Sequence, residues 1–278
     1  MSPSHPAVAK RRFTAIAVAA MVAWGLTGAG LLATVPAAQS SDRYAGSALA
    51  PAVVVQAVVD TAAGAKAQAK ERIRAANTLV VFGDSVTARY NDRAGHPEQG
   101  FWSMLAGELG ARTEVRAQPG AGFVNPGGVG CTGSTFGGQL ARPAVAEAVA
   151  GAGAVVIEGG RTDTQTCRQG GGYDLVPDRQ VGRAAAAFMA QVRRLRGGDP
   201  ACTVVVVPWG PAGLVANRDR ITGIVRAAAA RQGFTFVDTL GLLTEATTIE
   251  DGVHPTRSGN EALTRAILDQ SALEGCFA

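Results

Sequence analysis

Histidine is scarce in this sequence, with only three residues among 278. His5 lies close to the N-terminus, and His96 lies in a polar loop where a solvated imidazole is expected. His254 precedes a predicted helix, and a carboxylate, Asp251, stands three residues upstream. Any reaction that needs an imidazole base therefore has one strong candidate, His254.

Charged residues are absent from residues 13–38, an apolar stretch that follows the basic cluster Lys10, Arg11 and Arg12. This order is typical of an export signal, so we assign residues 1–38 to a signal peptide or signal anchor. Small residues at 35–37 favour cleavage, but the run is also long enough for a membrane tether. The leader has no cysteine, which excludes a lipid-modified one. We expect a secreted or cell-envelope protein.

The net charge is small, +4, and three of the positive side chains lie in the leader. The rest of the chain is close to neutral, with its arginines scattered along the sequence. No basic stripe that could follow a phosphate backbone is present, so nucleic acid is not an expected partner. The sequence gives no indication of the oligomeric state.

Cysteine is limited to Cys131, Cys167, Cys202 and Cys276, and no two of them stand at C-x-x-C spacing. This spacing disfavours a zinc site, and we expect no bound metal. An even number of cysteines in an exported chain favours disulfides, with three possible pairings. We prefer Cys131–Cys167, which joins two glycine-rich loops, and Cys202–Cys276, which ties the C-terminus to the start of a strand.

Residues 39–76 are expected to form a linker followed by a helix over 51–76, and residues 77–278 a single domain. In that domain, short β-branched runs alternate with longer alanine-rich segments, as in buried parallel strands joined by helices. The expected strands are 79–82, 113–116, 154–157, 203–207 and 234–237. The expected helices are 100–109, 139–150, 178–195, 218–232 and 258–270, the last with a capping box at Ser258 and Glu261. This order predicts an α/β fold, a three-layer α/β/α sandwich with a central five-stranded parallel sheet.

Gly83, Asp84 and Ser85 directly follow the first expected strand. Binding sites of parallel sheets form at the carboxyl ends of the strands, so the Ser85 hydroxyl can face a cleft. The tripeptide alone fits a simple helix-capping turn equally well. If Asp251 accepts the Nδ1 hydrogen of His254, however, Nε2 is left free to take a proton from the serine.

Four blocks in this order resemble those of SGNH/GDSL hydrolases, over about residues 79–270. They are Gly83-Asp84-Ser85, a glycine loop after the second strand, Gly160-Arg161-Thr162-Asp163 after the third, and Asp251-x-x-His254 before the last helix. The sequences at 100–102 and 122–127 are similar to those of the secreted actinobacterial branch of this family. The G-x-S-x-G motif of classical α/β-hydrolases is absent.

The resemblance implies that Ser85 is the nucleophile, His254 the base and Asp251 the group that orients the imidazole. It places the oxyanion hole at the backbone N–H groups of Ser85 and Gly120, with Gly122 as the alternative to Gly120. The third donor would be Thr162, where the family has asparagine. A threonine hydroxyl is shorter than an amide, so we expect a slow esterase in which Thr162→Asn raises turnover and Thr162→Ala lowers it.

No cofactor is expected. Residues 128–133 match G-x-G-x-x-G, but they follow a loop instead of a strand, which argues against dinucleotide binding. The acids Glu158, Asp163 and Asp174 could suggest glycosidic chemistry. With no second block to hold them, they are interpreted as loop caps or ion pairs.

The leading hypothesis is an exported serine esterase that hydrolyses carboxylic ester or O-acyl groups through an acyl-enzyme on Ser85. The alternatives are a degenerate SGNH fold that only binds, and a cell-envelope acyltransferase. The substrate class would be a small-molecule, lipid or acylated glycan ester. Loops 120–138 and 164–173 are expected to cover the site, with Phe123, Phe136 and Tyr173 as an apolar wall and a mild preference for short acyl chains.

Overall fold

The computed structural model describes residues 76–91, 99–168, 171–213 and 215–277. The predicted leader at 1–38 and the linker at 39–50 lie outside these residues, as does His96. So does the predicted helix at 51–76, apart from its last residue. In the described part of the chain, no helix is both long enough and apolar enough to cross a membrane.

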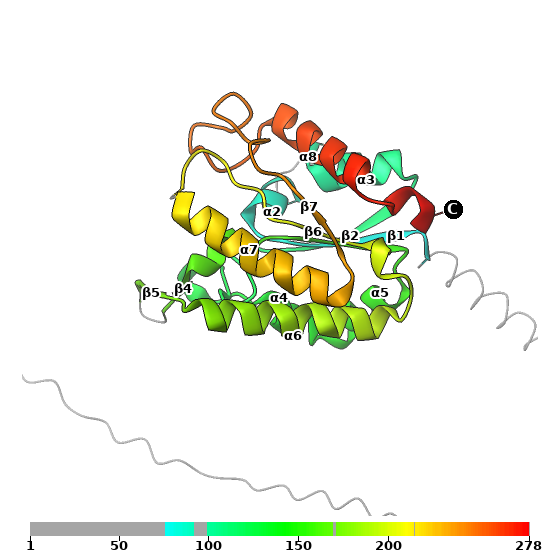
Figure 1. Cartoon of the computed structure of the whole chain (residues 1–278), viewed down its shortest axis with the longest axis horizontal. Helices are drawn as coiled ribbons and strands as arrows, with labels where there is room; N and C mark the ends of the chain where they lie inside the picture. The colour runs from blue at the N-terminus through cyan, green and yellow to red at the C-terminus, as the bar shows by residue number, and fades with distance from the viewer. Residues whose placement is uncertain (1–75, 92–98, 169–170, 214, 278) are drawn as a thin grey trace, which may run out of the picture. The chain divides into compact units, whose positions relative to one another are not determined.

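Five parallel strands form the central sheet, in the order β2-β1-β3-β6-β7 (Figure 1). The strands are β1 (Thr78–Gly83), β2 (Arg112–Ala117), β3 (Ala154–Glu158), β6 (Thr203–Val206) and β7 (Thr235–Val237). Each coincides with a predicted β-branched run, to within one or two residues at either end. Because β1, β3 and β6 are buried on both faces, their sequences are continuously apolar instead of alternating.

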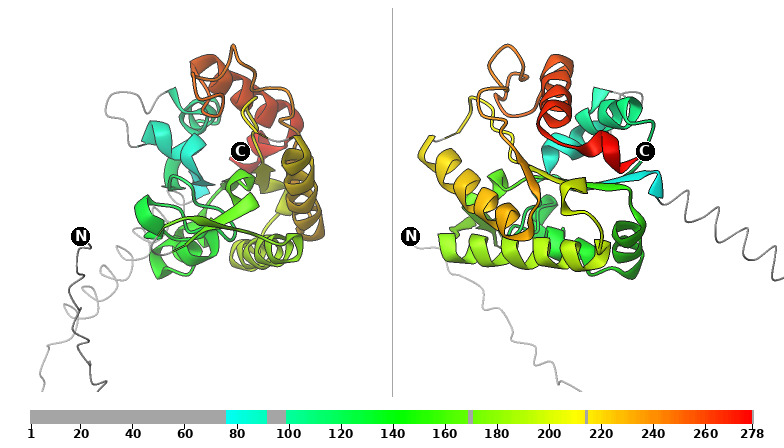
Figure 2. Two further views of the ribbon diagram at one scale, coloured as in Figure 1. Left: turned by 90° about the vertical axis from the view of Figure 1, so that its left-hand side faces the viewer. Right: turned by 45° about the vertical axis from the view of Figure 1, so that its right-hand side comes forward.

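Helices cover both faces of the sheet, as Figure 2 shows, which confirms the predicted three-layer α/β/α sandwich. Along β1, Val80 and Phe82 join one buried cluster, whereas Leu79 and Val81 join the other. One layer contains α4 (Phe136–Leu140), α5 (Pro143–Gly151), α6 (Asp178–Arg196) and α7 (Val215–Gln232). The other contains α2 (Ser85–Asn91), α3 (Phe101–Glu108) and α8 (Arg257–Gln270).

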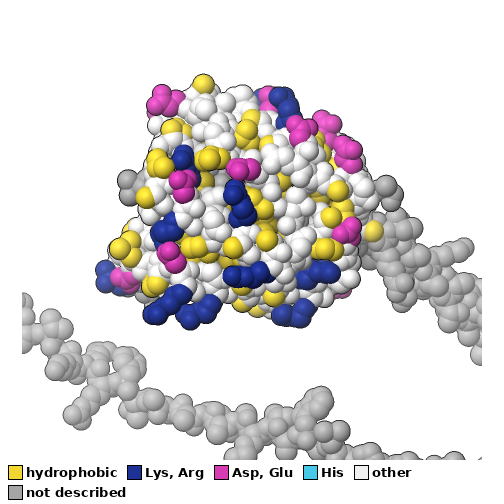
Figure 3. Space-filling model, viewed as in Figure 1, with side chains coloured by type: hydrophobic (Ala, Val, Ile, Leu, Met, Phe, Trp, Pro, Cys, Tyr) yellow, Lys and Arg dark blue, Asp and Glu magenta, His cyan; other side chains and the backbone are white. Residues whose placement is uncertain are grey.

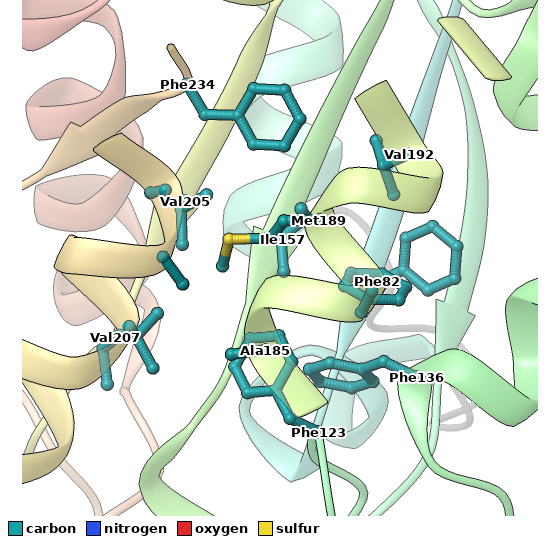
Figure 4. Packing of buried hydrophobic residues seen from close by; sticks show 14 of the residues in the cluster. Phe82, Phe123, Phe136, Ile157, Ala185, Met189, Val192, Val205, Val207 and Phe234 are labelled. Carbon is teal, nitrogen blue, oxygen red and sulfur yellow. The ribbon is translucent and has the colours of Figure 1, made fainter. Parts of the chain in front are cut away.

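The rings of Phe82, Phe123, Phe136 and Phe188 pack together beneath the first of these layers, and Figure 4 labels Phe82, Phe123 and Phe136. Phe82 meets Phe188 edge to face at 5.2 Å, and Phe123 meets Phe136 in the same way at 5.3 Å. Phe123 and Phe136 are therefore core residues, and their assignment to an apolar wall of the site was wrong. Tyr173, the third residue of that expected wall, is exposed. The loop that begins at residue 120 is anchored by its own aromatic side chains.

Helix α6 shows why an arginine-rich segment can lie against an apolar core. Val181, Ala185 and Met189 recur at helical spacing and are buried, while Arg183 and Arg194 are exposed. Dark-blue side chains accordingly gather along the lower edge of Figure 3, where α6 lies in Figure 1. The arginines are thus the solvated face of a packed helix.

Two features differ from the predicted elements. Helix α8 begins at Arg257, so Ser258 lies inside its first turn, and Thr256 is the cap, accepting a hydrogen bond from the Gly259 N–H at 3.4 Å. The expected capping box at Ser258 was therefore wrong. The expected loop at 164–173 contains one strand of a short antiparallel hairpin, β4 (Gln165–Cys167), and reaches the start of the other, β5 (Tyr173–Leu175).

The disulfides are Cys131–Cys167 and Cys202–Cys276, as preferred from the sequence. The first joins the glycine-rich loop after β2 to the hairpin, and the second ties the C-terminal segment to the start of β6. Disulfides of this kind persist in oxidising compartments, so they indicate a protein that folds outside the cytoplasm.

Candidate active site

Ser85 is the first residue of α2, separated from β1 by Asp84 alone, and its side chain is half-buried. The turn is tight because a Cβ at Gly83 would lie only 2.2 Å from Thr87 Oγ1. Asp84 closes the turn by accepting the Val86 N–H at 2.8 Å. No acceptor among the described residues engages the Ser85 N–H. Both its hydroxyl and its amide therefore stand at the carboxyl edge of the sheet.

Asp251 and His254 lie in the loop between β7 and α8. The Asp251 Oδ2 is 2.6 Å from His254 Nδ1, and its Oδ1 accepts the N–H groups of Val253 and His254, both at 2.9 Å. Burial opposes ionisation of Asp251, but these hydrogen bonds outweigh it and lower its pKa to about 2. The carboxylate is therefore ionised at neutral pH. It selects the tautomer in which Nδ1 carries the hydrogen and Nε2 is free to act as a base.

Gly252 gives this loop its shape. Its φ is +62°, a left-handed conformation that favours glycine, and its carbonyl accepts the Ala212 N–H at 2.9 Å. The same close approach leaves a Cβ at this position only 3.0 Å from the Cβ of Ala212. The loop is thus fastened to the segment after β6, which fixes Asp251 and His254 relative to the sheet.

Arg89 connects this loop to the serine helix. Its guanidinium is 3.7 Å from Asp251 Oδ2, and it follows Ser85 by four residues, on the same side of α2. A charge on His254 also favours the ionised form of Asp84, the residue before Ser85. No direct Ser85–His254 hydrogen bond is present among the described residues. Such bonds are often long in free hydrolases and shorten when substrate binds.

Gly120 lies three residues after the end of β2, in a loop joined to the end of β1. The Gln118 N–H donates to the Gly83 carbonyl at 3.0 Å, next to the Ser85 turn. Gly120 has φ +76°, and its N–H has no acceptor among the residues that the structure describes. The Gly122 N–H instead donates to the Asn125 carbonyl at 2.9 Å. Of the two glycines, Gly120 therefore has the available amide.

Thr162 lies in the short 3₁₀ turn after β3, Arg161–Thr164. Its hydroxyl is 2.9 Å from the Ala121 carbonyl and donates its hydrogen there. To donate to an oxyanion, the hydroxyl would have to turn away from that carbonyl. The nearby Asn125 side-chain amide is engaged as well, by the carbonyls of Thr162 and Gln165.

Asp163 is a supporting residue that the sequence pattern left among the loop caps and ion pairs. Its carboxylate is buried and accepts three successive backbone N–H groups, those of Phe123, Val124 and Asn125, at 2.7 to 3.0 Å. Burial raises its pKa to about 6, against the lowering effect of these hydrogen bonds. Its position shortly after the third strand was the sequence feature that could have marked it as part of the site. Its partners, being backbone groups, left no trace in the sequence.

A pocket of about 570 Å³ lies against Asp251. It is lined by Pro211, Ala212, Thr248 and Gly252, and two acids, Glu245 and Glu250, contribute to its wall. These carboxylates, with no basic residue among the described residues of the lining, disfavour an anionic group in the pocket.

The chain is similar to a known family and to several solved structures. Residues 81–262 match the model of the GDSL-like Lipase/Acylhydrolase family. The crystal structure of TesA is 20% identical, with 69% of this chain and 97% of that chain covered and a TM-score of 0.49. An active-site mutant of a family two carbohydrate esterase from Clostridium thermocellum is 16% identical, with 68% and 61% covered and a TM-score of 0.50.

A search of curated proteins finds no match to the sequence. The family match, however, extends over more than half of the chain, from within β1 to within α8. The chain therefore belongs to the GDSL-like lipase/acylhydrolase family.

Proposed function

We propose that this protein is an exported serine esterase that hydrolyses carboxylic ester or O-acyl groups through an acyl-enzyme on Ser85. The observation that carries the proposal is the 2.6 Å contact between Asp251 Oδ2 and His254 Nδ1, which leaves Nε2 free in a loop that Arg89 of the Ser85 helix contacts. The two disulfides support the extracytoplasmic location.

In the proposed reaction, Ser85 Oγ attacks the ester carbonyl carbon while His254 Nε2 takes the hydroxyl proton. The developing oxyanion accepts hydrogen bonds from the N–H groups of Ser85 and Gly120. The tetrahedral intermediate collapses as the imidazolium gives its proton to the leaving alcohol. A water molecule, deprotonated by the same nitrogen, then attacks the acyl-enzyme and restores Ser85. Asp251 holds the imidazole in place and stabilises its charged form throughout.

The proposed substrate has a short acyl chain. Phe123 and Phe136 are buried in the core, so two of the three aromatic side chains expected beside the site cannot line a path for a long chain. The pocket beside Asp251, with its two acids, disfavours an anionic alcohol part.

The proposal is tested by treating the purified protein with a fluorophosphonate and locating the adduct by peptide mass spectrometry. We expect a single adduct on Ser85, together with measurable hydrolysis of p-nitrophenyl acetate. If the protein shows neither labelling nor turnover, the result supports a binding module instead. Added alcohols or sugars that divert the acyl group from water would support an acyltransferase.

Thr162 provides a second expected result. Thr162→Val keeps the shape of the side chain but removes the hydrogen bond to Ala121, which borders Gly120. We expect kcat to fall about 5- to 10-fold, the equivalent of one hydrogen bond of about 1 kcal/mol. Thr162→Ser retains the hydroxyl and serves as the control. If Thr162→Asn raises turnover, the amide reaches the oxyanion; equal rates for all these variants would place residue 162 outside the oxyanion hole.

A further inference from the structure

Two carboxyl groups that the proposed triad does not use lie directly beneath Ser85. Glu158 is the last residue of β3, and Asp84 is the residue between β1 and Ser85. Because β1 and β3 pair with Phe82 opposite Ile157, Glu158 lies beside the end of β1. Asp84 has no exposed surface and Glu158 has 1%. Charged side chains are rarely buried to this extent without compensating partners.

The hydrogen bonds of this pair leave one oxygen without a donor. Glu158 Oε2 accepts the Asp84 N–H at 3.0 Å and the Thr87 hydroxyl at 2.9 Å. Asp84 Oδ1 accepts the Val86 N–H, but Asp84 Oδ2 is buried with no partner among the described residues. A buried carboxylate oxygen of this kind calls for a donor.

The surrounding charges indicate which group could supply that donor. Arg161 and His254 both favour an ionised Asp84, while Asp163 is a further acid close to it. Two neighbouring buried carboxyls cannot both ionise without a large cost. Burial and the charge of Asp84 raise the pKa of Glu158 well above its ordinary value. Burial also raises the pKa of Asp84, but Arg161 and the Val86 N–H oppose that change.

We propose that Glu158 is a positioning residue that remains a neutral carboxylic acid and donates its proton to Asp84 Oδ2, so that the two side chains hold the turn presenting Ser85. This inference rests on the proposed esterase function. Glu158 then accepts two hydrogen bonds through one oxygen and donates one through the other. In this arrangement the buried Asp84 Oδ2 gains its donor, and the turn that carries the Ser85 hydroxyl and N–H is held in place.

Glutamine tests this assignment because it is the neutral isostere of a protonated glutamate. In Glu158→Gln, the amide oxygen can accept from Asp84 N–H and Thr87, and the NH₂ group can donate to Asp84 Oδ2. For Glu158→Gln we expect kcat for p-nitrophenyl acetate at pH 7 to stay within about 3-fold of wild type. For Glu158→Ala we expect kcat to fall by about 30-fold or more with little change in KM, because misplacement of a reacting group lowers the rate of the chemical step. Glu147→Gln, at an exposed position on α5, is the matched control.

The pH dependence of kcat and Tm distinguishes a protonated Glu158 from a glutamate whose role does not depend on its proton. Since the pKa of Glu158 is raised in the folded state, its favourable contribution is complete below the unfolded value of about 4.5 and is lost as the pH rises through the folded value. Wild-type kcat and Tm should therefore decline as the pH rises, and Glu158→Gln should show a weaker decline, to which Asp84 and Asp163 still contribute.

Two results would overturn the assignment. Glu158→Gln could lose as much activity at pH 7 as Glu158→Ala, which would mean that an ionised glutamate is required. It could also share the full alkaline decline of the wild type. If Glu158→Ala does not fold, Asp84→Asn replaces it, since its amide can donate to Glu158 and should also preserve turnover. Absence of wild-type turnover would instead contradict the esterase proposal, while the Tm profiles would still test the carboxyl pair.

Discussion

Ser85→Ala and His254→Ala are each expected to lower kcat for p-nitrophenyl acetate by about 10⁴- to 10⁶-fold, the range for removal of a nucleophile or its base from a serine hydrolase. Alanine at 85 leaves no oxygen to form the acyl-enzyme. Alanine at 254 leaves the serine proton without an acceptor, because Asp251 is directed at Nδ1 and not at the serine. Steady-state kinetics at pH 7, with circular dichroism to verify folding, measures both losses.

The double variant Ser85→Ala/His254→Ala should be no slower than either single variant, because the two residues act as one unit. Ser103→Ala is the matched control, since Ser103 is also partly buried and lies in the first turn of a helix, α3. It should retain wild-type turnover. If Ser85→Ala kept a tenth of the wild-type rate, or still reacted with a fluorophosphonate, Ser85 would not be the nucleophile.

The three central strands β1, β3 and β6 were predictable because they are buried on both faces. Strands of this kind have continuous β-branched sequences, and the longer segments between them form the helices that connect parallel strands. The cap of α8 was mispredicted since Ser258 and Thr256 are equally good capping residues by type. The choice between them depends on where the chain leaves its contact with Thr247, whose carbonyl accepts the Thr256 N–H at 2.9 Å.

The candidate triad was open to prediction because histidine is rare and Asp251 and His254 are neighbours in sequence. The buried carboxyl pair beneath the triad could not be predicted from the sequence. Glu158 and Asp84 are 74 residues apart, and their proximity follows only from the pairing of β1 with β3. Phe123 was expected near the site because of its loop, yet the loop folds back and uses that ring as an anchor in the core. Contacts set by topology leave no local pattern.

The loop that carries Gly120 has its own buried support, and removing it gives the largest expected loss of stability. In Asp163→Asn, the amide oxygen can replace only one carboxylate oxygen, and the NH₂ group faces a backbone N–H, donor against donor. Leaving such buried donors unpaired should lower the unfolding free energy by about 2–4 kcal/mol. For a domain of this size, that corresponds to a fall in Tm of roughly 4–16 °C, measured by calorimetry or circular dichroism.

Turnover of Asp163→Asn should fall as well, by about 100-fold at a temperature where the variant is folded, because a displaced Gly120 N–H no longer meets the oxyanion. Asp174→Asn is the control, since Asp174 is exposed and only 3.8 Å from an equally exposed Arg168. Exposed pairs of this kind contribute about 0–1 kcal/mol, so its Tm and kcat should match those of the wild type. If Asp163→Asn lost stability but kept full turnover, the loop would not supply an oxyanion donor, and the amide proposed at Gly120 would have to come from another segment.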